Sequence, residues 1–116
     1  MATAAKIRDK AGQKLGVKAL GQALESSVSD DLDDAYTEVF ERLRAEDLVS
    51  WHSTEEVPEE LVSPVVDLVA FQRVDEYGVN SERYQRLAMA ASQAEVRIRR
   101  TLQVDYFTNE DEAVYF

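Results

Sequence analysis

The chain has 116 residues, 45% of them hydrophobic, and contains no cysteine and one histidine. A chain of this size can form one domain without disulfides or metal, and these counts exclude thiol catalysis, zinc–thiolate sites and multi-histidine metal sites. The net charge of −10 argues against general nucleic-acid binding. No apolar run reaches the roughly 20 residues of a membrane span, and we expect neither a signal peptide nor a cofactor.

The first helix is predicted from Thr3, which can cap it, to Gly16, a natural stop. An apolar stripe repeats every four residues: Ile7, Ala11 and Leu15. A basic stripe lies beside it: Lys6, Lys10 and Lys14.

A second helix is predicted from Ser29, acting as its cap, to about Leu48, after a linker over residues 17–28. Its first turns are acidic, which suits the positive end of the helix dipole; the residues are Asp30, Asp31, Asp33 and Asp34. One face is apolar: Leu32, Tyr36, Val39, Phe40 and Leu43. Trp51 then favours a plug that closes one end of the core, with a partner contact as the alternative. His52 beside it is interpreted as a surface residue, because no nucleophile is recognisable near it.

A central helix is predicted over residues 57–78, because apolar residues cover most of its circumference between Leu61 and Phe71. Such a helix should be buried on more than one side. Pro58 suits its first turn. Pro64 either kinks a continuous helix or precedes a fresh start capped by Ser63, and we favour the continuous helix.

The last helix is predicted from a cap at Asn80 or Ser81 to residue 102. One face is apolar over about five turns: Tyr84, Leu87, Ala88, Ala91, Ala94, Ile98 and Leu102. With the central helix it should form an antiparallel hairpin. Arginines 97, 99 and 100 would then lie in the final turns, where the helix dipole favours cations; phosphate contact is the alternative.

The sequence therefore predicts an all-α protein, a four-helix bundle over residues 1–103 followed by an extended C-terminal arm over residues 104–116. The arm has no helical period. Its apolar and aromatic residues are candidates for binding a partner chain, for example as an added strand: Val104, Tyr106, Phe107, Val114, Tyr115 and Phe116. Folding back onto the bundle is the alternative.

Charge is unevenly distributed along the chain. Residues 1–18 hold five basic residues and one acidic residue, whereas residues 25–60 hold thirteen acidic and two basic ones. Copies of the chain could therefore attract one another head to tail, or both regions could simply be solvated. The candidate inter-subunit contacts are Lys6, Lys10, Lys14, Asp30, Asp31 and Asp34.

Motifs for catalysis are missing. There is no glycine-rich phosphate loop, no metal-ligand spacing and no nucleophile with its base. We therefore expect a protein that is not an enzyme. The alternative is a hydrolase that uses two carboxylates, but among 23 acidic residues such a pair could also arise by chance.

Several segments, in order, resemble the small head–tail adaptor (head-completion or connector) proteins of tailed bacteriophages. The segments are Ile7–Ala11 with Lys14–Val17, Ser29–Asp31, Ala45–Leu48 with Trp51, Val57–Leu61, Pro64, Glu76–Val79 and the alanine-rich last helix with its arginines. Together they cover about residues 3–102.

The resemblance implies a helical bundle that assembles as a ring, commonly a dodecamer, beneath the portal protein of a virion. Such a ring extends the DNA channel, joins tail or nozzle proteins and helps to retain packaged double-stranded DNA, with no membrane involved. The chain would be made in the host cytoplasm and reside at the head–tail junction. A different class remains open, a small acidic intracellular regulator of antitoxin or anti-repressor type that binds one partner protein.

Overall fold

The computed structural model describes residues 2–18, 21–52 and 55–114, with side chains described as far as residue 101. Over these residues the fold is all-α, as predicted, with four α-helices and no strand beyond a single antiparallel bridge between Ala2 and Val57. The elements in chain order are α1 (Ala4–Leu15), α2 (Ser26–Ala45), α3 (Glu59–Gln72), the short 3₁₀ helix η1 (Val74–Glu76) and α4 (Ser81–Val114).

α1 follows the prediction closely. The Thr3 hydroxyl caps it by accepting a hydrogen bond from the Lys6 amide at 3.3 Å. Gly16 ends it in the left-handed conformation, with φ of 78°. The apolar stripe is buried, since Ile7 and Ala11 are 0% exposed.

α2 begins four residues earlier than predicted, since its cap is Glu25 and not Ser29. The chain enters it at Glu25, whose side chain makes no capping bond, so Ser29 lies inside the first turn instead of capping the helix. The aspartates predicted for the first turns therefore begin only in the second turn, at Asp30, and the first turn, where the helix dipole acts most strongly, holds no acidic residue. The helix ends through Asp47, which adopts φ of 57° so that the Leu48 amide reaches the Leu43 carbonyl at 2.8 Å.

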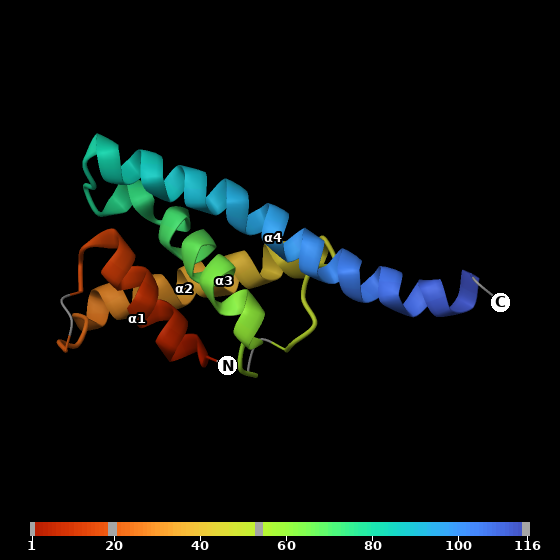
Figure 1. Ribbon diagram of the computed structural model, residues 1–116. Coiled ribbons are helices and arrows are strands. Elements are labelled where there is room, and N and C mark those ends of the chain that lie inside the picture. The colour runs from red at the N-terminus through yellow and green to blue at the C-terminus, as the bar shows by residue number, and fades with distance from the viewer. Residues whose placement is uncertain (1, 19–20, 53–54, 115–116) are drawn as a thin grey trace.

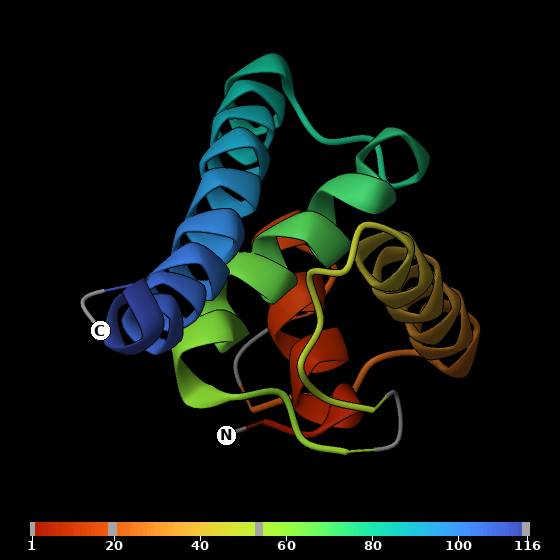
Figure 2. The same cartoon turned by 90° about the vertical axis from the view of Figure 1, so that its right-hand side faces the viewer.

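α3 is the centre of the fold. It contacts α1, α2 and α4, and in Figure 2 it lies between α4 on one side and α1 and α2 on the other. The helix is continuous through Pro64, which excludes a fresh start at Ser63. It is shorter than predicted, because the chain tightens into η1 after Gln72; Gly78 still supplies a left-handed turn, with φ of 62°.

α4 begins as predicted, with the Asn80 side chain accepting a hydrogen bond from the Arg83 amide at 2.8 Å. It then runs back across α3 and continues past the other helices to Val114 (Figure 1). The extended conformation predicted from residue 104 is wrong for residues 104–114. No glycine or proline follows Gly78, so nothing in the backbone interrupts the helix.

The longer α4 also corrects the explanation of the arginine cluster. Arg97, Arg99 and Arg100 lie more than three turns before the end of the helix, too far for its dipole to act on them. Arg99 instead contacts Glu46 of the α2 cap at 3.2 Å.

The plug role of Trp51 is confirmed. Its side chain packs edge-on against Phe40 with ring centroids 6.0 Å apart, and its Nε1 donates to the Tyr36 hydroxyl at 3.2 Å. Only 7% of Trp51 is exposed, so almost none of its ring is open to a partner.

Candidate functional site

The most distinctive surface is a cleft along α1, made of three hollows that share lining residues. The first, about 490 Å³, lies between α1 and the start of α3. The second, about 250 Å³, shares Lys10, Gln13 and Val62 with the first. The third, about 360 Å³, shares Lys14 with the second and extends to the first turns of α4. The hollows are therefore adjacent to one another along α1, and together they are called the basic cleft here.

The charge of the basic cleft opposes that of the rest of the protein. Six basic residues line it: Lys6, Lys10, Lys14, Lys18, Arg83 and Arg86. Two acidic residues, Asp9 and Glu59, line it as well. Its formal charge is thus +4, which leaves seven basic and 21 acidic residues, or −14, for the remainder of the chain.

Helix geometry explains how the cleft forms. Lys6, Lys10 and Lys14 are spaced by four residues, so they project from one face of α1. α4 starts beside the end of α1, where a Cβ at Gly16 would lie 1.8 Å from the Arg83 guanidinium, and this brings Arg83 and Arg86 to the same groove. The sequence pattern found the three lysines but missed the arginines, because only the tertiary fold places the start of α4 there.

The predicted contact residues differ in how far they are engaged within the chain. Lys6 and Lys10 are exposed, whereas the Lys14 ammonium contacts Asp67 of α3 at 2.7 Å. Asp30 and Asp34 are exposed on α2. Some of the charges predicted to attract a second copy are therefore paired within the chain. Arg8 of α1 is also paired in this way, with Asp33 of α2 at 3.3 Å.

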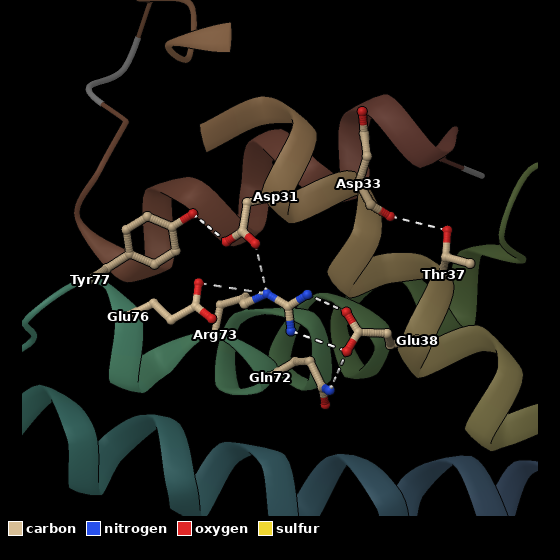
Figure 3. A network of polar contacts seen from close by, with 8 residues as sticks. All are labelled: Asp31, Asp33, Thr37, Glu38, Gln72, Arg73, Glu76 and Tyr77. Carbon is tan, nitrogen blue, oxygen red and sulfur yellow. Dashed lines mark hydrogen bonds and ion pairs between the residues drawn. The ribbon is translucent and has the colours of Figure 1, made fainter. Parts of the chain in front are cut away.

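Asp31 belongs to an internal network, shown in Figure 3. The Arg73 guanidinium lies between two carboxylates of α2, contacting Asp31 at 3.0 Å and Glu38 through both of its terminal nitrogens. The Tyr77 hydroxyl donates to the other Asp31 oxygen at 2.6 Å. This arrangement joins α2 to the turn between α3 and α4.

The network shifts the acidity of its members. Burial raises the pKa of Asp31, but hydrogen bonds from Tyr77 and Arg73 outweigh burial and leave that pKa below its ordinary value. The Arg73 hydrogen bonds lower the pKa of Glu38. Burial and the bond to Asp31 raise the pKa of Tyr77. All three shifts favour the protonation states in which the network is intact at neutral pH.

The candidate arm begins on a helical backbone. Positions 104, 106, 107 and 114 lie in the part of α4 that extends beyond the bundle, and their side chains are outside those described. Tyr115 and Phe116 lie outside the described residues.

The basic cleft has the chemistry of an anion-binding surface, suited to carboxylates or phosphates. Among the residues whose placement is described, no group of three or more His, Asp or Glu is arranged to hold a metal ion. No helix in the described ranges is both long and apolar enough to cross a bilayer. Comparisons with protein-family models, with curated proteins and with solved structures give no match.

Proposed function

We propose that this chain is a structural head–tail adaptor of a tailed-phage virion, one subunit of a ring that joins the portal protein to tail or nozzle proteins. The proposal starts from the resemblance of residues 3–102 to that family, and the all-helical fold is compatible with it. In this role the ring surrounds the channel for double-stranded DNA and helps to retain the genome.

The observation that carries the proposal is the division of formal charge between the basic cleft, at +4, and the rest of the chain, at −14. A ring requires two different complementary patches on each copy. Lys6 and Arg8 are two residues apart and therefore project from roughly opposite sides of α1. Since Arg8 contacts α2, the cleft and the acidic α2 lie on different sides of α1, available to different neighbours.

The excess negative charge also suits a DNA channel. Acidic walls repel phosphates, so DNA slides past them instead of binding. The segment of α4 beyond the bundle, with residues 115 and 116, is the part of the chain that we assign to the portal.

The direct test measures the mass of the purified full chain, alone and mixed with the portal ring of its own virion. We expect a ring of many copies on the portal, and Lys10→Glu in the centre of the cleft should reduce its formation by at least tenfold at low salt. Arg97→Glu makes the same charge change at an exposed position of α4, outside both the basic cleft and α2, and should leave assembly intact. Equal assembly by both variants contradicts the cleft as the interface between subunits.

A deletion separates this function from that of an acidic regulator. Removing residues 104–116 should abolish binding to the portal while the bundle stays folded, as judged by circular dichroism. A regulator that binds its partner through the bundle would keep that partner after the deletion.

A further inference from the structure

The side of α4 that faces away from the bundle carries exposed apolar residues. Met89 is 65% exposed and Val96 is 50% exposed, whereas Ile98, on the opposite side of the helix, is buried. α4 forms one edge of the molecule in Figure 2, and no other described element lies beyond it. This outer face has no partner within the described part of the chain.

The helical register extends the outer face along the whole of α4. Val96 follows Met89 by seven residues, Phe107 follows Val96 by eleven, and Val114 follows Phe107 by seven. An α-helix turns about 100° per residue, so these four positions fall within about 20° of one another around the axis. The spacings of seven, eleven and seven residues read the same from either end. The row of these four residues is therefore symmetric about the midpoint between residues 101 and 102.

The charges of α4 are arranged about the same midpoint. Residues 81–101 hold five arginines and two glutamates, a charge of +3. Residues 102–114 hold four acidic residues and no basic one, a charge of −4. Two such helices side by side repel when parallel and attract when antiparallel.

We propose that two copies of this chain pair through the outer faces of their α4 helices in antiparallel orientation. In this register Val96 lies opposite the partner's Phe107, and Met89 opposite the partner's Val114. A two-fold interface requires that each contact occur twice, with the two residues exchanged, and the symmetric row satisfies this condition. Each positive half of α4 then covers the partner's negative half.

The pairing also explains how a helix can continue beyond its own bundle. Residues 102–114 only propagate α4, and most helical stability in proteins comes from the packing of an apolar face, not from propensity. A second α4 supplies the surface on which residues 102–114 can pack. In the free protein this dimer covers the segment that the proposed function assigns to the portal, so the arm is released only when a partner competes for it.

The first test is sedimentation equilibrium of the full chain over a concentration series. We expect a monomer–dimer equilibrium for the wild type and a dissociation constant at least tenfold higher for Val96→Glu. Ala5→Glu, at an exposed position of α1, should behave as the wild type. Circular dichroism checks that each variant is folded. A wild-type chain that is monomeric throughout, or equal dissociation constants for the two variants, overturns the proposal.

The second test fixes the orientation, using the absence of cysteine from the chain. Chains with Val96→Cys are mixed with chains carrying Phe107→Cys and oxidised with diamide. We expect a covalent dimer in the mixture, because opposed positions come within disulfide distance. Neither variant should crosslink alone, since two copies of position 96 are about 16 Å apart along antiparallel axes, beyond disulfide reach. Crosslinking of Val96→Cys by itself indicates parallel helices and overturns the proposal.

These results do not depend on the portal. A dimer that forms by itself but never binds a portal leaves the pairing intact and contradicts the proposed function. Portal binding by a chain that is always monomeric when free supports the proposed function and contradicts the pairing.

Discussion

The Lys14 Nζ lies 2.7 Å from Asp67 Oδ1 and links α1 to α3 across 53 residues of sequence. Asp67 is 8% exposed and is the one buried charged residue in the described part of the chain. The buried carboxylate therefore has its counter-charge supplied by a residue that lines the basic cleft. Cleft and core are connected through this pair.

Lys14→Met should lower the free energy of unfolding by about 1–3 kcal/mol, because it leaves the Asp67 carboxylate buried without a partner. Adding Asp67→Leu should restore most of the loss, since an apolar pair needs no counter-charge. Urea denaturation followed by Trp51 fluorescence measures both effects. Lys6→Met, at an exposed position of the same helix, is the control and should change stability by less than about 0.5 kcal/mol. Equal losses at both positions would contradict a structural role for the pair.

Acid should weaken the Arg73 network. The pKa values of Asp31 and Glu38 lie below their ordinary values in the folded protein. These carboxylates bind fewer protons folded than unfolded, so their contribution is present above about pH 4.5 and is lost as the pH falls through their folded-state pKa values. Thermal unfolding from about pH 6 to pH 3 should therefore show a steeper stability loss for the wild type than for Arg73→Met.

Added salt and a substitution outside the network provide the controls for the acid experiment. Glu38 is nearly half exposed, so added salt should reduce the difference between the wild type and Arg73→Met. Arg44→Met, at an exposed ion pair within α2, should keep the wild-type acid profile. Parallel pH profiles for the wild type and Arg73→Met would refute the linkage.

Alkali should act through Tyr77, whose pKa is raised by burial and by the hydrogen bond to Asp31. Above about pH 10 the unfolded chain releases the phenol proton while the folded chain retains it, so stability falls. Tyr77→Phe should cost about 1 kcal/mol at neutral pH and flatten the alkaline decline. Tyr84→Phe, at a residue that is 40% exposed, serves as the matched substitution and should change stability at neutral pH by less than about 0.5 kcal/mol.

Asp47→Gly should stabilise the protein by about 0.5–1 kcal/mol. Asp47 ends α2 with φ of 57°, a conformation that costs a residue with a Cβ more than it costs glycine. Asp34→Gly, at an exposed position inside α2, should instead destabilise by a similar amount. Chemical denaturation of both variants checks the opposite signs, and a loss of stability at position 47 would exclude backbone strain as the dominant effect.

The sequence predicted the helices well wherever the spacing of apolar residues and the side-chain caps point to the same helix boundaries. The buried stripe of α1, its Thr3 cap, the continuous α3 and the Asn80 cap of α4 all follow from apolar spacing and side-chain hydrogen bonding. The start of α2 was missed because the cap at Glu25 makes no side-chain bond that a pattern could reveal. The end of α4 was missed because the residues after 103 show no apolar period by which a helix could be recognised.

The site was less predictable, because charge pairing is a tertiary property. The sequence marked a basic stripe and an acidic helix, but not that Asp31 is held by Arg73, 42 residues away. Gly12 illustrates the same limit. By propensity alanine is better there, yet a Cβ would come within 2.9 Å of Leu24.

The position of α3 between the other three helices has a consequence for the unfolded chain. Residues 61–71 form the most apolar segment of the sequence, and when the bundle opens this segment is released into water. Such segments promote aggregation unless charge or proline interrupts them. Pro64 and Asp67 are the interruptions. Pro64 and Asp67 each carry a structural cost in the folded protein, but both should reduce aggregation of this segment while α4, which follows α3 in the chain, does not yet cover it.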